Sequence, residues 1–230
     1  MAEFVNPVGK IRGKYGNVIG YVRKNGKNYC KSAGLKRKPN GEVQKRQSVA
    51  FGATTERKRW LMVAIRLGFP GGNGYPKGFN GFVSANVTSA VEVERVDPEK
   101  PISARKKAGR EFRGEIDYRK LRVAAGQLVP PSVSAEVDAE NRKVHFTSPG
   151  EQLELIDCFL DDKIYGVVAG VRNKRCHVVE LGTRGEAIGT SVDFPRDVEA
   201  DELVVYVFAA GADGKDVADS VCLRVSSDGV

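Results

Sequence analysis

Short runs of alternating apolar and polar residues dominate the second half of the chain, from about residue 115 onward. Alternation with a period of two places successive side chains on opposite faces of a strand. The runs lie at residues 118–124, 133–137, 144–146, 153–155, 164–169, 176–181, 187–194, 203–209 and 217–225. Strands separated by turn residues roughly every 8–12 positions predict an antiparallel β-sandwich.

A different pattern fills residues 9–34, where Gly, Lys and aromatic or β-branched residues surround an Asn25-Gly26 pair. Residues 18–23 and 28–32 are typical of strands on either side of that pair. Asn-Gly suits the positive φ angles of a type I′ turn, so we expect a β-hairpin here. Because an isolated two-stranded ribbon is marginally stable in water, we expect the hairpin to pack against something else.

Two stretches between these regions have helical spacing. Residues 42–67 contain no Pro and only Gly52 as a glycine, and the apolar run at 60–65 predicts that this end is buried. A second stripe recurs every three or four residues at Phe79, Phe82/Val83, Asn86/Val87 and Ala90/Val91. The mixed-charge residues 92–115, with two prolines, are expected to form a loop or linker.

Together these patterns predict an α+β fold that is mostly β. We expect residues 1–115 to form a basic hairpin-and-helix region with the linker at about 92–115. Residues 116–230 are expected to form an acidic β-sandwich of the immunoglobulin or fibronectin type III class. The Cys…Trp…Cys pattern of antibody domains is absent, because the only tryptophan, Trp60, precedes this region.

The charge of the chain changes along its length. The formal net charge is +8, but residues 1–130 hold 27 Lys/Arg against 10 Asp/Glu, whereas residues 131–230 hold 10 against 19. A cationic excess favours a polyanion such as nucleic acid, because neutralised phosphates release condensed counterions. It also suits an acidic protein surface, either in the chain's own C-terminal region or in a neighbouring copy. Both kinds of partner are therefore open.

The candidate binding residues lie in the hairpin, in the basic turn after it and on the first helix. Tyrosines offer surfaces on which bases stack, while Lys and Arg follow the phosphates. The alternative is that the tyrosines pack the ribbon against the helix at 42–67. The candidate cations are Lys14, Arg23, Lys24, Lys27, Lys31, Lys36, Arg37, Lys38, Lys45, Arg46 and Arg57, and the candidate stacking residues are Tyr15, Tyr21 and Tyr29.

Residues that support catalysis are sparse, and we expect no enzymatic activity. The two histidines, His145 and His177, both fall in predicted strands, and Cys176 faces the opposite side of its strand from His177. The four cysteines lack the paired short spacing of zinc sites. The Gly-rich residues 71–74 are not followed by the Lys-Ser/Thr of a phosphate-binding loop. We therefore assign no catalytic residue, no metal and no cofactor.

Four blocks of sequence carry a family resemblance. They are Gly13-Lys14-Tyr15-Gly16-Asn17-Val18-Ile19-Gly20; Phe79-Asn80 with Val83-Ser84, Asn86 and Ala90-Val91; Asp117-Tyr118 with Lys120, Gly126 and Leu128; and Ala212-Asp213-Gly214-Lys215 with Val217 and Ser220-Val221. In this order they resemble an uncharacterised domain-of-unknown-function family of Bacteroides-type bacteria. The stretch after Gly20 departs from that family's Ser-Ser-Trp-Lys-Gly-like sequence. The resemblance implies a hairpin-and-helix region joined to a fibronectin-like domain, and it implies no activity.

These observations favour a non-enzymatic binding or assembly protein, for example a phage or mobile-element assembly subunit. In this interpretation the basic region engages a polyanion or an acidic neighbouring subunit; a dedicated nucleic-acid-binding protein is the alternative. The expected partners are other copies of the chain or another protein, without a membrane or a small-molecule substrate. Residues 1–7 lack the pattern of a signal peptide, so we expect synthesis in the cytoplasm and a place in a virion or other assembly.

Overall fold

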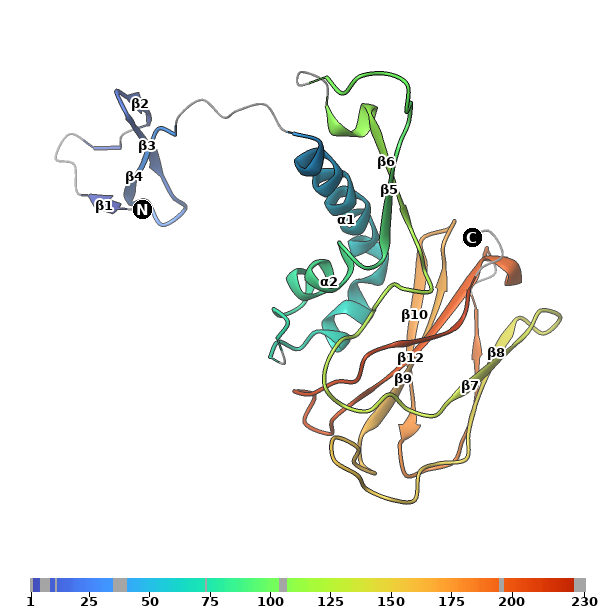
Figure 1. Cartoon of the computed structure of the whole chain (residues 1–230). Helices are drawn as coiled ribbons and strands as arrows, with labels where there is room; N and C mark the ends of the chain where they lie inside the picture. The colour runs from blue at the N-terminus through green and yellow to red at the C-terminus, as the bar shows by residue number, and fades with distance from the viewer. Residues whose placement is uncertain are drawn as a thin grey trace. The chain divides into compact units, whose positions relative to one another are not determined.

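The chain divides into two compact units, Met1–Asn40 and Gly41–Val230, which we call the N-terminal unit and the body. A computed structural model describes residues 9–10, 12–34, 41–72, 74–103, 107–194 and 197–225, together with the backbone of residues 2–4 (Figure 1). The division lies far from the boundary expected near residue 115, because both helices pack with the strands of the body.

The N-terminal unit is a four-stranded antiparallel sheet with the strand order β1-β4-β3-β2. Its strands are β1 (Ala2–Phe4), β2 (Gly13–Tyr15), β3 (Val18–Val22) and β4 (Asn28–Ser32). The expected hairpin is present as β3 and β4, but its expected type I′ turn is wrong. Only Gly26 of the Asn-Gly pair has a positive φ, 78°, and its N–H donates to the Arg23 carbonyl at 2.9 Å. This is the longer hairpin connection in which a glycine follows a type I turn.

Among the residues described, the body contains two α-helices, two short 3-10 helices and nine strands, and the strands form antiparallel sheets. The helices are α1 (Glu42–Gly68) and α2 (Phe79–Asn86), and a two-stranded sheet joins β5 (Val91–Arg95) to β6 (Phe112–Ile116). A three-stranded sheet has the order β11-β8-β7, from β7 (Ser134–Asp138), β8 (Lys143–Ser148) and β11 (Ile188–Asp193). A four-stranded sheet has the order β10-β9-β12-β13, from β9 (Lys163–Gly170), β10 (Arg175–Thr183), β12 (Leu203–Ala210) and β13 (Val221–Arg224). The α+β, mostly β fold is thus confirmed.

Five expectations for individual segments are corrected. Residues 92–115 are not simply a linker, because their ends pair as β5 and β6. The second helix ends at Asn86, and Val91 already belongs to β5. Residues 118–124 and 153–155 form no named strand, and the last strand covers only Val221–Arg224 of the expected 217–225. By contrast, α1 lies within one residue of the predicted helix.

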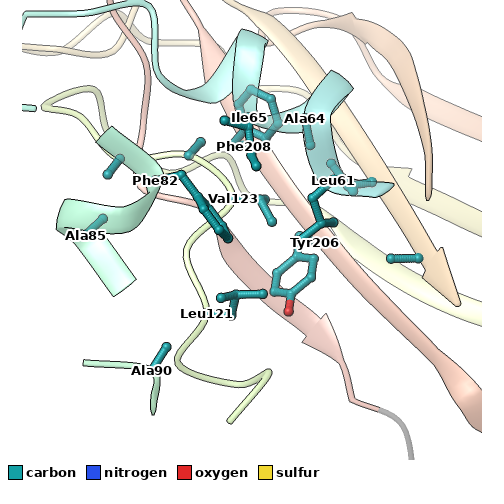
Figure 2. Packing of buried hydrophobic residues seen from close by; sticks show 14 of the residues in the cluster. Leu61, Ala64, Ile65, Phe82, Ala85, Ala90, Leu121, Val123, Tyr206 and Phe208 are labelled. Carbon is teal, nitrogen blue, oxygen red and sulfur yellow. The ribbon is translucent and has the colours of Figure 1, made fainter. Parts of the chain in front are cut away.

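Three layers of structure meet at the four-stranded sheet. One face of this sheet packs on the three-stranded sheet, where Val205 and Val207 of β12 contact Phe146 and its neighbours in one buried cluster. The opposite face packs on α1, α2 and residues 118–125. In Figure 2, Leu61 and Ile65 of α1 and Phe82 of α2 surround Tyr206 and Phe208 of β12. All eight residues of β12 are consequently buried.

Residues 118–125 belong to no sheet, yet Tyr118, Leu121 and residues 123–125 are buried, and side chains satisfy part of the segment's backbone. Asn86 is fully buried; its amide donates to the Arg122 carbonyl at 2.8 Å and accepts the Arg122 N–H at 2.7 Å. The Ser220 hydroxyl accepts the Val123 N–H at 3.0 Å. Buried peptide groups require such partners, so these contacts fix the segment between the helices and the sheet.

Residues 123 and 124 lie close to Gly68, the last residue of α1, and a substitution of this glycine tests that approach. A Cβ at position 68 would lie 2.2 Å from the Val123 carbonyl oxygen and 2.6 Å from Ala124. We expect Gly68→Ala to lower the free energy of unfolding by about 1–3 kcal/mol, because buried backbone must move. Urea unfolding measures the change.

Gly52 provides the matched control on the same helix, because nothing lies within 4 Å of a Cβ there. Gly52→Ala should raise the free energy of unfolding by about 0.5–1 kcal/mol through the lower backbone entropy of alanine. Equal effects of the two substitutions would contradict the close approach at Gly68.

Candidate functional site

The pairing of the N-terminal sheet decides which of its side chains share a face. Tyr21 pairs with Tyr29, Ile19 with Lys31, and Lys14 with Ile19. Paired residues in an antiparallel sheet lie on one face, and residues two apart along a strand do as well. One face therefore carries Lys14, Ile19, Tyr21, Tyr29 and Lys31. We call it the cation–aromatic face.

The side chains of this face contact one another. The Tyr21 and Tyr29 rings are stacked, with centroids 6.0 Å apart and planes 26° apart. The Arg23 guanidinium lies 4.7 Å from the centre of the Tyr29 ring, and the Lys31 ammonium lies 5.8 Å from that of Tyr21. Asn25 donates to the Tyr29 hydroxyl at 3.0 Å. The two rings and the cations thus form one ordered surface, in which each ring attracts a positive charge.

The other predicted hairpin residues lie elsewhere. Tyr15 pairs with Val18 and so belongs to the opposite face, where it is 59% exposed and donates to the Arg12 carbonyl at 3.3 Å. Lys24 and Lys27 are exposed in the turn between β3 and β4. The candidates Lys36, Arg37 and Lys38 lie outside the described residues. The sheet therefore brings together two of the three tyrosines.

The basic excess of the chain lies in the N-terminal unit. Residues 1–40 hold 10 of the 37 Lys/Arg and 1 of the 29 Asp/Glu, which leaves 27 and 28 in the body. The N-terminal unit therefore has a formal charge of +9, and the body has −1. Glu3 is the only carboxylate side chain in residues 1–40, so the unit cannot neutralise its own cations.

The N-terminal sheet also lacks an apolar core among its described residues. The buried hydrophobic clusters of the structure all lie in the body, and within residues 9–10 and 12–34 only Gly20 is buried. A small sheet usually needs one packed apolar face for independent stability. Within residues 9–10 and 12–34, therefore, neither face of the sheet packs on a buried apolar cluster.

The three helical candidates are engaged inside the body. Lys45 is only 2% exposed and forms an ion pair with Glu111. Arg46 donates to the Val93 carbonyl at 2.9 Å and lies 5.2 Å from the centre of the Phe112 ring. These contacts hold the β5–β6 sheet against α1; Lys45 is buried by them, whereas the Arg46 side chain stays 42% exposed.

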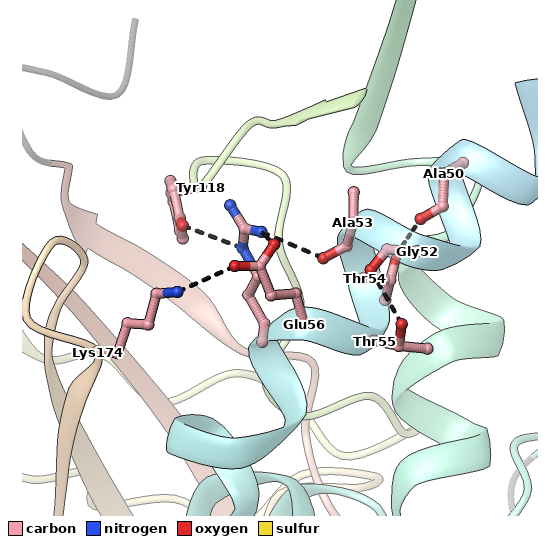
Figure 3. A network of polar contacts seen from close by, with 9 residues as sticks. Ala50, Gly52, Ala53, Thr54, Thr55, Glu56, Tyr118 and Lys174 are labelled. Atoms are coloured by element: carbon pink, nitrogen blue, oxygen red, sulfur yellow. Dashed lines mark hydrogen bonds and ion pairs between the residues drawn. The ribbon is translucent and has the colours of Figure 1, made fainter. Parts of the chain in front are cut away.

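A polar network on α1 includes Glu56, with Tyr118 and Lys174 beside it (Figure 3), and Arg57 belongs to the same network. It lies 3.4 Å from the Tyr118 hydroxyl and forms an ion pair with Glu56 at 3.1 Å. Glu56 also pairs with Lys174 at 3.0 Å. The hydrogen bond from Lys174 and the charge of Arg57 hold the pKa of Glu56 below its usual value. The network connects α1 to the turn between β9 and β10.

An open groove of about 510 Å³ adjoins this network. Its walls come from α1, from β6 and the residues that follow it, and from Val171. The charged side chains along it are Arg57, Glu92, Arg113, Glu115, Asp117 and Arg119. Several of them already form ion pairs with one another or with Lys120, for example Arg113 with Glu115 at 3.0 Å. Because these charges are already paired, they do not indicate which substrate or ion the groove would bind.

His145, to which the sequence analysis assigned no catalytic role, lies beside a serine and an aspartate. The Nδ1 atom of His145 lies 2.7 Å from the Ser191 hydroxyl, and its Nε2 atom lies 3.7 Å from Asp138. Ser, His and Asp in this order resemble a catalytic triad. However, they lie across three neighbouring strands on a water-exposed sheet face and outside the groove described above. The contact is a cross-strand polar interaction between partly exposed side chains.

The cysteines are separated by the fold. Cys176 lies on β10 and Cys222 on β13, which are opposite edges of the four-stranded sheet, and Cys158 lies in the loop before β9. Within the part of the chain that the structure describes, no group of three or more His, Cys, Asp or Glu side chains is placed to hold a metal ion. Neither α1 nor α2 is long and apolar enough to cross a membrane.

Comparisons with known proteins add no assignment. No family model, no curated protein and no solved structure matches the chain. The family resemblance of the four sequence blocks therefore stays a prediction.

The rate of thiol modification tests whether Cys176 and Cys222 are reactive in the folded body. Burial raises the pKa of Cys176 to about 12 and that of Cys222 to about 11. Because the thiolate is the reactive form, we expect iodoacetamide at pH 8 to modify both residues at least about tenfold more slowly in the folded protein than in urea. Peptide mass spectrometry reads the extent at each site. Rapid modification of folded Cys176 would show instead an activated thiol.

Proposed function

We propose that this protein is a non-enzymatic binding or assembly protein, whose N-terminal unit engages a polyanion or an acidic neighbouring subunit. The observation that carries the proposal is the distribution of charge between the two units, +9 against −1. A unit of forty residues with one carboxylate repels itself, and an anionic surface relieves that repulsion. The proposal extends to an assembly subunit, such as one of a phage or another mobile element.

The body is the protein-interaction module in this proposal, and the strand order supports its finer assignment. A three-stranded sheet, β11-β8-β7, faces a four-stranded sheet, β10-β9-β12-β13. Seven antiparallel strands divided between two packed sheets are typical of immunoglobulin and fibronectin type III domains. We propose that residues 131–225 belong to this class. Such domains present strand edges and end loops to other proteins.

A dedicated nucleic-acid-binding protein is the second candidate, and the cation–aromatic face favours it. Two stacked tyrosines flanked by Lys14 and Lys31 provide surfaces for bases beside charges for phosphates. This combination suits single strands, because every base has a face that can stack.

Charge reversal in the N-terminal unit tests the assembly proposal. We expect the full-length triple variant Lys14→Glu/Lys24→Glu/Lys31→Glu, called the charge variant, to lose self-association that the unaltered protein shows at about 0.1 M salt. Sedimentation velocity measures the change. The matched control reverses three exposed cations of the body, Arg66→Glu/Lys77→Glu/Lys107→Glu, and should sediment like the unaltered protein. A single monomeric species for the unaltered protein would refute self-assembly.

Tyrosine replacement tests the nucleic-acid alternative. Titration with labelled single-stranded DNA and RNA at two salt concentrations should give binding that weakens steeply with salt if this function holds. Tyr21→Leu/Tyr29→Leu keeps the apolar bulk but removes the stacking surface, and it should weaken binding by about tenfold or more. Tyr15→Leu, on the opposite face, should leave binding unchanged. Equal losses in both variants, or no binding at all, would count against this function.

A further inference from the structure

The loop of residues 151–162, before β9, exposes several large apolar side chains. Ile156 is 88% exposed, Leu153 is 75% exposed and Leu155 is 66% exposed, and Phe159 is also exposed. Sequence alternation predicted a strand at 153–155, and a strand would have buried one side of it. The loop instead pairs Leu155 with Cys158 in a tight turn, with mutual backbone hydrogen bonds of 3.0 and 3.1 Å.

One buried arginine, Arg184, holds both ends of the loop. The Arg184 side chain is fully buried and forms ion pairs with Glu151 at 3.0 Å and Asp162 at 3.2 Å, one at each end of the loop. It also donates to the Val129 carbonyl at 2.7 Å. Burial opposes the ionisation of Glu151, but hydrogen bonds from Cys158 and Arg184 hold its pKa below the usual value. The carboxylate therefore stays charged beside the arginine.

Further backbone contacts fix the exposed part of the loop. The Asp157 carbonyl accepts the Val129 N–H at 2.8 Å, and the Leu160 carbonyl accepts the Gly185 N–H at 2.9 Å. Asp157 has a φ of 60°, a left-handed conformation that Asp tolerates better than most residues. The apolar side chains are thus presented on an ordered support. Exposed apolar groups on such a support mark binding surfaces, because little entropy is lost when a partner covers them.

The surroundings of the loop are acidic. Glu154, Asp157 and Asp161 are exposed around the apolar side chains, whereas Asp162 is buried against Arg184. The loop from 151 to 162 contains five acidic residues and no Lys or Arg. Its apolar tip with a negative rim is complementary to a surface of aromatic rings and cations. The cation–aromatic face of the N-terminal unit has that composition.

We propose that the 151–162 loop of one copy docks on the cation–aromatic face of a second copy. This inference rests on the proposed assembly function and names the two surfaces that would join. The surfaces differ, so the contact is heterologous: in a joined pair, one copy keeps an unused cation–aromatic face and the other keeps an unused loop. Repetition of the contact builds a ring or an open chain of copies rather than a closed two-fold dimer.

Full-length variants of each surface test this contact. The loop variant, Leu153→Ser/Ile156→Ser, alters only exposed side chains, and we expect it to self-associate about tenfold or more weakly than the unaltered protein. The charge variant should show a similar loss. Val63→Ser/Val96→Ser is the matched control, because these valines are 57% and 59% exposed elsewhere on the body. Circular dichroism and thermal melting should be unchanged in all variants.

Mixing the two defective variants provides the decisive measurement. The loop variant retains its cation–aromatic face, and the charge variant retains its loop. An equimolar mixture should therefore form heterodimers through one intact contact and grow no further. Sedimentation equilibrium, with one variant fluorescently labelled and all samples treated with nuclease, detects this species.

The outcomes separate the inference from the proposed function. A monomeric unaltered protein would overturn the docking contact and self-assembly, and would leave binding of a polyanion as the proposed function. Normal assembly of the loop variant, or a mixture without heterodimers, would overturn the docking contact alone and leave assembly through other surfaces. Assembly that disappears after nuclease treatment would overturn direct docking in favour of a nucleic-acid bridge. Heterodimers in the mixture, with neither variant assembling alone, would support the contact.

Discussion

Strand β12 is buried along both of its faces, and the two main hydrophobic clusters of the body meet across it. Leu203, Val205 and Val207 fill the space between the two sheets, while Val204, Tyr206 and Phe208 face the helices. An antiparallel sandwich commonly leaves the outer face of each sheet in water. Here α1, α2 and residues 118–125 cover it, and Tyr206 donates to the Tyr118 carbonyl at 2.8 Å. Loss of that cover would expose apolar side chains worth roughly 1.5–3 kcal/mol each. The helices are therefore part of the body's core.

The same packing decides which cations remain available for a partner. Docking α1 on the β5–β6 sheet uses Lys45 and Arg46, and its contact with Tyr118 and Glu56 uses Arg57. The body holds 27 Lys/Arg and 28 Asp/Glu in all, so its charges nearly balance, and the basic excess belongs to residues 1–40. The imbalance between halves of the sequence thus becomes an imbalance between a small sheet, in which only Gly20 is buried among the described residues, and a well-packed body. In the proposed function, a partner supplies both the negative charge and the burial for that sheet.

Local pattern predicted the elements whose contacts are local or repetitive. The helical period identified α1, and alternation identified β3, β4 and most strands of the body. The prediction of a strand at 118–124 was wrong because side chains distant in sequence, Asn86 and Ser220, bond to this backbone in place of a neighbouring strand. Burial of Lys45 could not be predicted either, since Glu111 lies 66 positions away. The unbroken apolar run of 203–210 was the available signal for a strand buried on both faces. At the candidate site, a type I′ turn at Asn25-Gly26 would have paired Val22 with Tyr29, whereas the longer turn that is present places Tyr21 opposite Tyr29.

The buried position of Arg184 requires an explanation, because it costs free energy. An arginine buried with two carboxylates is costly to desolvate, and apolar side chains of similar volume often serve stability equally well. Its network does something that apolar packing cannot, because directional bonds to Glu151, Asp162 and the Val129 carbonyl fix both ends of one loop. A loop held in this way keeps Leu153 and Ile156 in water instead of collapsing onto the sheet. Stability alone gives no reason to hold them there. Recognition does, because a preorganised apolar tip loses little entropy on binding and its acidic rim selects a cationic surface.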